Sequence, residues 1–227
     1  MTLDPRDSAL QSHVPSVMVP RFGAIEQLAE HDRRGHRYLV AEDGLWLEVR
    51  RPWLRMVALI APVAVEGIRL PYGRFSDKLG CTWGGKEFDI AYAWEPADLD
   101  RLQTLFLHDA RAALPNEFAA WGVWNGTAKR LEYRPLIAMD ATPAGITFSR
   151  PSLESHEDLA IDLHSHGTMD AFFSGTDDED DAGEVKIAVV AGRLDGDPVF
   201  ATRLCCLGLY IDGSSDQVTA YAPEQSQ

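Results

Sequence analysis

Residues 158–177 read DLAIDLHSHGTMDAFFSGTD and join a short apolar strand to side chains that bind metals. The pattern over 158–163 is that of a buried strand, and it delivers His164 and His166 at its C-terminal end. Side chains two residues apart on a strand project from the same face, so both imidazoles can reach one metal ion. The stretch therefore predicts a strand that presents a pair of histidines.

Two further residues complete the pattern H-x-H-x7-S-x2-D, namely Ser174 and Asp177. An acidic third ligand that returns from the following loop, with two imidazoles, leaves the fourth tetrahedral position of zinc open to water, as in a catalytic site. An H-x-H pair alone is also typical of solvated or core histidines at a strand end. The added Ser and Asp at these spacings favour zinc.

The pattern resembles the signature of the JAMM zinc metalloproteases (also called MPN+ or JAB), in which a distant Glu joins H-x-H-x7-S-x2-D. Bacterial members carry this Glu in a segment P-x-E-x-x-G, to which Pro115-Asn116-Glu117 followed by Gly122 is similar, with a longer gap of four residues. The resemblance implies an α/β (α+β) fold, in which a mixed β-sheet is flanked by helices.

The local pattern supports the position of Glu117 between a helix and a strand. The helix is predicted to start at Pro96 and to stop at Pro115. Residues 118–124 are apolar enough for a buried strand. Helical spacing relates Leu99, Leu102, Phe106, Ala110 and Ala113.

The resemblance assigns His164, His166 and Asp177 to Zn²⁺, which lowers the pKa of its bound water. Glu117 is then the general base, which passes the proton on to the leaving amine. The alternative is that Glu117 is a solvated carboxylate at a helix end and that another acid, such as Glu132, is the base.

Ser174 has no base paired with it in the motif, so its hydroxyl is expected to donate to the oxyanion rather than to attack. Many members have Pro after the second His and before the Ser, where this chain has Gly167 and Phe173. Gly167 would allow a more flexible turn. Met169, Phe172 and Phe173 make the loop apolar, for packing against the core or for contact with a substrate tail.

The chain is acidic, with 21 basic and 35 acidic residues and a net charge of -14. Apart from Asp177, the acidic run 177–181 is predicted to be a solvated helix N-terminus. An acidic chain disfavours nucleic acid and attracts a basic peptide or the basic face of a partner. Of the 3 cysteines, Cys205 and Cys206 are predicted to be buried in a strand over 203–210 rather than to bind metal.

The chain is predicted to have two domains. Residues 1–20 are polar and are expected to be disordered, and 21–95 form a small β-rich N-terminal domain of unknown role. The JAMM/MPN-like domain covers 96–222. Segments 37–41, 45–50, 56–60 and 88–94 are predicted strands, and 80–85 is not a phosphate loop. With no membrane span and no signal peptide in the pattern, we expect a cytoplasmic protein.

The chain also resembles a family of the plasmid-associated PRTRC cassette, on residues 162–167 (DLHSHG) and 172–178 (FFSGTDD). Members of that family stand beside proteins similar to ubiquitin-activating enzymes and to ubiquitin-like proteins. This resemblance implies a deubiquitinase-like isopeptidase that acts on a ubiquitin-like protein precursor or its conjugates, with a ubiquitin-activating-enzyme-like partner.

Two other classes share the motif. RadC-like modules associated with DNA repair typically have Pro after the second His and an added DNA-binding segment; Gly167 and the acidic balance argue against them. Non-catalytic MPN scaffolds usually lose metal ligands, whereas all three are present here.

Overall fold

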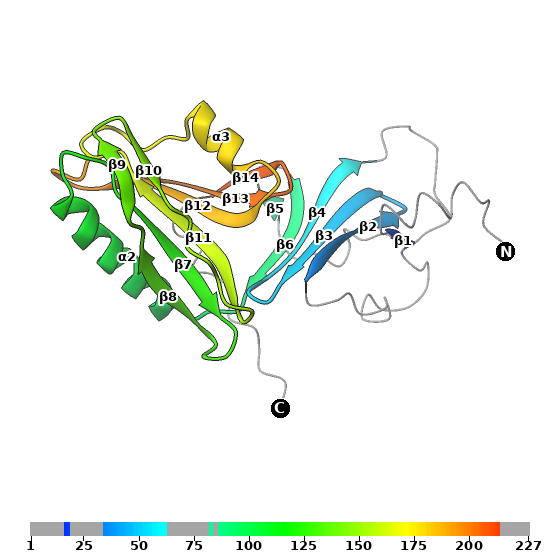
Figure 1. Ribbon diagram of the computed structural model, residues 1–227. Coiled ribbons are helices and arrows are strands. Elements are labelled where there is room, and N and C mark those ends of the chain that lie inside the picture. Colours follow the sequence, from blue (N-terminus) through cyan, green and yellow to red (C-terminus); the bar gives the residue numbers. More distant parts are fainter. Residues whose placement is uncertain (1–15, 19–33, 63–81, 84–85, 214–227) are drawn as a thin grey trace. The chain divides into compact units, whose positions relative to one another are not determined.

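The computed structural model describes residues 16–18, 34–62, 82–83 and 86–213 (Figure 1). The chain divides into two compact units, Met1–Tyr92 and Ala93–Gln227. Of the N-terminal residues 1–20, the structure describes only Ser16–Met18. In the described part of the chain, no helix is long and apolar enough to cross a membrane.

The first unit contains a six-stranded sheet in the order β1-β2-β3-β4-β6-β5. Its buried side chains include Trp46, Val49 and Met56 from the central strands. Strands β2, β3 and β4 follow one another as an antiparallel meander, while β1 pairs with β2 in parallel. The four predicted strands are confirmed. The bounds are β1 (Ser16–Met18), β2 (Gly35–Ala41), β3 (Gly44–Arg51), β4 (Leu54–Pro62), β5 (Thr82–Trp83) and β6 (Lys86–Tyr92). The segment 80–85, which is predicted not to be a phosphate loop, lies outside the described residues except for Thr82–Trp83.

The second unit is built on another six-stranded sheet, in the order β14-β13-β12-β11-β7-β8. Only β11 and β12 pair in parallel, so the sheet is mixed, as predicted. The bounds are β7 (Ala119–Asn125), β8 (Arg130–Pro135), β11 (Glu157–Ser165), β12 (Val185–Gly192), β13 (Val199–Cys206) and β14 (Leu209–Gly213). The single strand predicted over 203–210 was wrong. Positive φ angles at Leu207 and Gly208 turn the chain there, and β14 folds back on β13.

Helix α2 (Pro96–Ala112) covers one face of this sheet, over β7 and β8. Its buried side chains, Leu102, Phe106 and Ala110, recur every four residues, which confirms the predicted helix. A Cβ atom at Gly122 would lie 2.6 Å from Cδ1 of Leu102, so the glycine lets the helix approach β7 closely. Two hydrogen bonds join α2 to β8. Arg101 Nη2 donates to the Leu131 carbonyl, and the Tyr133 hydroxyl donates to Asp109.

The opposite face of the sheet carries a hairpin and a short helix. Strands β9 (Ala138–Thr142) and β10 (Gly145–Phe148) form the hairpin, whose Ile146 and Phe148 pack on Trp121 and Val123 of β7. Helix α3 (Gly175–Asp181) follows the histidine strand. Figure 1 shows α2 and α3 on opposite sides of the sheet. Helix α2 therefore packs on one face of the sheet. The other face, with the hairpin and α3, is the face on which a functional site can form.

Candidate metal centre

The two histidines lie where β11 ends at the middle of the sheet. Ile161 and Leu163 point to the face that α2 covers, and His164 points to the other face, because side chains alternate along the strand. His166 continues the pairing, since its backbone N–H donates to the carbonyl of Ala191 on β12 at 2.8 Å. The two Nε2 atoms of His164 and His166 are 3.3 Å apart. The two imidazole nitrogens are therefore close enough to bind one metal ion.

The tautomer of His166 follows from its other ring nitrogen. Nδ1 lies 3.3 Å from the backbone carbonyl of Asp170. A carbonyl oxygen can only accept, so Nδ1 carries the hydrogen and Nε2 keeps its lone pair. That lone pair is directed at the cluster, which is how a metal-binding histidine is usually oriented by a backbone carbonyl.

Asp177 reaches the histidines from the first turn of α3, where it forms a capping box with Ser174. The Ser174 backbone N–H and hydroxyl both donate to Oδ2 of Asp177, at 2.6 and 2.7 Å. In return the Asp177 N–H donates to the Ser174 hydroxyl oxygen at 3.3 Å. The other carboxylate oxygen, Oδ1, is left 3.3 Å from Nε2 of His164. The cap therefore selects which oxygen faces the histidines.

The three donor atoms of His164, His166 and Asp177 all lie within 4.8 Å of one another. A tetrahedral zinc ion with ligands at about 2.05 Å has ligand-to-ligand edges of about 3.3 Å. Two edges of the cluster have that length, from Nε2 of His164 to His166 and to Asp177. Two imidazole nitrogens and one carboxylate oxygen are also a donor set that zinc accepts. The residues fit a zinc ion with one position left open.

The protonation states suit a metal as well. Burial lowers the pKa of His164, although the Asp177 carboxylate acts in the opposite direction. Burial alone would raise the pKa of Asp177, but His164 and the donors of Ser174 lower it below its usual value. At neutral pH the site thus offers a neutral imidazole and a charged carboxylate, the forms that bind metal.

Glu117 comes to the same cavity from a distant part of the chain. Strand β7 pairs with β11 so that Ala119 stands opposite His164. Two hydrogen bonds extend this pairing, from Ser165 N–H to the Phe118 carbonyl at 2.9 Å and from Phe118 N–H to the Ser165 hydroxyl at 3.0 Å. Burial, and then the charge of Asp177, raise the pKa of the Glu117 carboxyl to about 7. A carboxyl group with this pKa can exchange protons near neutral pH.

The alternative base, Glu132, is not at the site. It lies on β8, where it accepts hydrogen bonds from Asn125 and Arg130. It is absent from the residues that line the cavity around the histidines.

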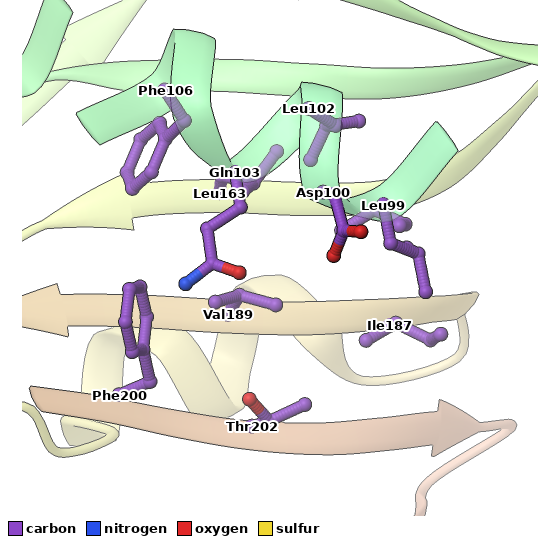
Figure 2. A pocket seen from close by; sticks show the side chains of 11 residues that line it. Leu99, Asp100, Leu102, Gln103, Phe106, Leu163, Ile187, Val189, Phe200 and Thr202 are labelled. Atoms are coloured by element: carbon purple, nitrogen blue, oxygen red, sulfur yellow. The ribbon is translucent and has the colours of Figure 1, made fainter. Parts of the chain in front are cut away.

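That cavity has a volume of about 800 Å³ and opens between the β9–β10 hairpin, the loop after β11 and α3. Glu117, His164, His166, Ser174 and Asp177 all line it. A smaller cavity of about 80 Å³ lies on the opposite face, beside α2 (Figure 2). Its lining is mostly apolar, with Leu99, Phe106, Val189 and Phe200 among the side chains drawn. The ionisable groups are therefore concentrated in the larger cavity.

Two expectations about the loop and the acidic run need correction. Gly167 is buried, takes the left-handed φ of 57°, and accepts a hydrogen bond from the Leu194 N–H at 2.9 Å, so its turn is tied to the chain after β12 rather than flexible. In the acidic run, Asp178, Glu179 and Asp180 are exposed, but Asp181 is only 4% exposed. It is held by cations of the sheet and is not solvated.

Four residues around the site escaped the sequence reasoning: Ser165, Asp170, Lys186 and Arg203. A usable signal existed for the last two, because a lysine and an arginine interrupt strands that are otherwise apolar. Cys205 and Cys206 are buried on β13, as predicted.

One family model covers the part of the chain that contains these residues. Residues 99–205 match the prokaryotic homologs of the JAB domain, a range that contains Glu117, both histidines, Ser174 and Asp177. The C-terminal unit belongs to the JAB family. The predicted family and the predicted fold are thereby confirmed.

Residues 4–80 match a domain of unknown function, DUF2016. Among solved structures, the solution structure of protein DSY2949 from Desulfitobacterium hafniense is similar, with 16% identity over 53% of this chain and 88% of that chain and a TM-score of 0.39. No curated protein matches the chain.

Proposed function

We propose that the JAB domain is a zinc-dependent peptidase or isopeptidase. The observation that carries this proposal is the cluster of three donor atoms, from His164, His166 and Asp177, on a cavity that also holds Glu117. The donor atoms lie within 4.8 Å of one another, and two of their separations are 3.3 Å. The JAB family includes metalloisopeptidases, and the chain retains a complete donor set.

His164, His166 and Asp177 would hold the ion, which supplies a water of lowered pKa and polarises the substrate carbonyl. Glu117 accepts the proton of the attacking water and gives it to the nitrogen of the leaving amine as the C–N bond breaks. In the metal-free chain, burial and the charge of Asp177 raise the pKa of this carboxyl to about 7.

Ser174 is proposed to donate to the oxyanion. In the structure its hydroxyl points to Oδ2 of Asp177, which the Ser174 backbone N–H also holds at 2.6 Å. Because the backbone donor suffices to orient Asp177, the hydroxyl is able to rotate towards substrate.

For the substrate we propose the tail of a ubiquitin-like protein, as a precursor or as a conjugate, with a ubiquitin-activating-enzyme-like partner. The resemblance to the PRTRC family supports this choice. The loop after β11 supports it too, since Met169 and Phe172 line the cavity and remain 43% and 48% exposed rather than buried in the core. Exposed apolar side chains beside the site are suited to contact another protein.

A nucleic-acid substrate finds little support in the same cavity. Its lining carries more acids than bases, and Lys186 and Arg150 are both paired with carboxylates. Phosphates would meet repulsion there.

The test combines metal analysis with a cleavage assay on the full chain. We expect about one zinc per chain in the wild type, loss of zinc in His164→Ala and in His166→Ala, and full zinc in Glu117→Gln. Cleavage of a ubiquitin-like precursor should fall by about 10⁴-fold in Glu117→Gln, because an amide cannot accept the proton. Glu132→Gln is the matched control and should cleave normally.

Each alternative has its own outcome. A wild-type chain that binds zinc but cleaves no ubiquitin-like precursor or conjugate would support the non-catalytic scaffold. Full zinc in both histidine variants would show that the ligands are misassigned. Near-normal turnover in Glu117→Gln would place the base elsewhere.

A further inference from the structure

Helix α3 carries Asp177, yet it has only seven residues. A helix of two turns is not stable by itself in water, because nucleation is unfavourable and few hydrogen bonds follow. Five of its residues are acidic, and their mutual repulsion adds to the problem. The position of Asp177 must therefore come from contacts between α3 and the sheet.

The first such contact is Arg203 on β13. Its Nε and Nη2 donate to Oδ2 of Asp181 at 3.0 and 2.7 Å, and its Nη1 donates to Asp178. Arg203 and Asp181 are both only 4% exposed. A buried guanidinium with a fixed planar fork determines the position of its carboxylates far more strictly than a surface ion pair does.

The same guanidinium also holds the chain just before α3. Its Cζ lies 3.9 Å from the ring centroid of Phe173 and 4.3 Å from that of Tyr210. Phe173 immediately precedes the cap residue Ser174, and the Tyr210 hydroxyl donates to the Asp178 carbonyl at 2.8 Å. Arg203 thus contacts both ends of the segment that contains Asp177.

The second contact is Lys186 on β12. Its Nζ donates to Asp181 at 2.8 Å, to Glu184 at 2.8 Å and to Asp162 at 2.7 Å. Asp162 lies two residues before His164 on β11, so both side chains project from the same face. One buried ammonium therefore links the strand of His164 to the helix of Asp177.

We propose that Arg203 and Lys186 are positioning residues for the third metal ligand, and that they set Asp177 at bonding distance from the metal position beside His164. The inference rests on the proposed function in one respect, namely that Asp177 binds zinc. Neither cation is proposed as a ligand of the metal. Their effect on the metal passes through Asp178, Asp181 and Asp162.

The sheet register makes this arrangement rigid. Asp162, Ala188 and Arg203 lie side by side on β11, β12 and β13. Lys186 therefore rises from the strand that pairs with the histidine strand, and Arg203 rises from the next strand of the same sheet. Ligand distances in a zinc site are defined to within about 0.2 Å, which a two-turn helix on flexible contacts would not provide. Ala188, which lies between Asp162 and Arg203 on the sheet, is small and leaves room for the long side chains of Lys186 and Arg203.

The test uses the full chain and three variants. Arg203→Lys keeps the charge but removes the fork and the stacking on Phe173. Asp162→Asn weakens the ion pair between Lys186 and β11. Asp178→Asn weakens the ion pair of Arg203 Nη1 with Asp178, whose side chain is 54% exposed. The matched control is Arg134→Lys, which weakens a two-bond pair with Glu157 at the other end of β11.

Three quantities are measured on each protein: the zinc dissociation constant by competition with a chromogenic chelator, the visible absorption spectrum of the Co²⁺-substituted protein, and the thermal unfolding midpoint without metal. We expect Arg203→Lys and Asp162→Asn to weaken zinc binding by about 10- to 100-fold and to change the Co²⁺ spectrum. Arg134→Lys should keep both metal properties of the wild type even where its midpoint falls.

The inference is overturned by folded Arg203→Lys and Asp162→Asn proteins with wild-type zinc affinity and Co²⁺ spectrum, or by an equal loss of affinity in Arg134→Lys, which would indicate general destabilisation. If Arg203→Lys does not fold, Asp178→Asn decides, with a several-fold loss expected and no change refuting the inference. A wild type that binds no zinc removes the proposed function and this inference together, whereas zinc that depends on His164 but not on Arg203 removes only the inference.

Discussion

Gly192 lies directly beneath the backbone of Asp170. A Cβ atom at Gly192 would stand 2.6 Å from the Asp170 carbonyl carbon and 2.3 Å from the Met169 carbonyl oxygen. The carbonyl of Asp170 is the acceptor for Nδ1 of His166. The missing side chain at the end of β12 therefore lets the loop lie close enough for the Asp170 carbonyl to orient His166, a proposed metal ligand.

Gly192→Ala is expected to lift residues 169–171 and to break the hydrogen bond to His166, since the added carbon meets backbone atoms that cannot rotate away. Zinc affinity should fall by about 10-fold or more, as measured by chelator competition. Gly196→Ala is the matched control, because a Cβ atom there meets nothing within 4 Å. Equal zinc affinity in the two variants would contradict the role of Gly192.

Ser174→Ala separates two uses of the same hydroxyl. The Ser174 backbone N–H continues to hold Oδ2 of Asp177 in the variant, so zinc content should stay near the wild-type value. Turnover should fall on the order of 10²-fold, because one donor to the oxyanion is lost. Zinc content and cleavage rate are measured on the same preparation. Loss of zinc in proportion to activity would mean that the hydroxyl serves mainly to orient Asp177.

Glu117 should make the stability of the metal-free chain depend on pH. Its pKa is raised in the folded state to about 7, so its stabilising contribution is complete below its ordinary value of 4.5 and is lost as the pH rises through 7. The free energy of unfolding of metal-free Glu117→Gln should therefore rise relative to that of the wild type as the pH increases from 5 to about 8. Urea unfolding of both proteins at several pH values measures the difference. If the free energies of unfolding of the two proteins differ by the same amount at every pH, the raised pKa is refuted. The control Glu132→Gln should show the same pH dependence as the wild type.

A fragment that starts at Ala93 should fold and bind zinc, because the compact unit Ala93–Gln227 contains α2 and the complete donor set. If residues before 93 recruit the partner protein, the fragment should lose affinity for that partner while its zinc affinity is unchanged. Circular dichroism and metal analysis of the fragment measure the first point. An insoluble fragment would show that both units share one core.

The cluster of His164, His166 and Asp177 could be proposed from the sequence because its determinants are local. His164 and His166 are related by the two-residue period of a strand, and Ser174 and Asp177 by the three-residue spacing of a capping box. Glu117 lies far from them in the chain, and only the resemblance to a known family identified it. The pairing of β7 with β11 brings it to the cavity, and spacing alone contains no information on that pairing.

The sequence by itself determined the strand with its two histidines, the helix that ends near Pro115, and the short capped helix with Asp177, since each depends on residues within a few turns of one another. The tertiary structure alone decided which charges meet. Lys186 and Arg203 meet Asp162 and Asp181 because β12 lies parallel to β11 and β13 antiparallel to β12. Asp162, Lys186 and Arg203 thereby share one face of the sheet, and α3 brings Asp181 to the two cations on that face. Sheet order and register arise from long-range packing, and for that reason the acidic run that seemed solvated contains a buried anchor of the metal centre.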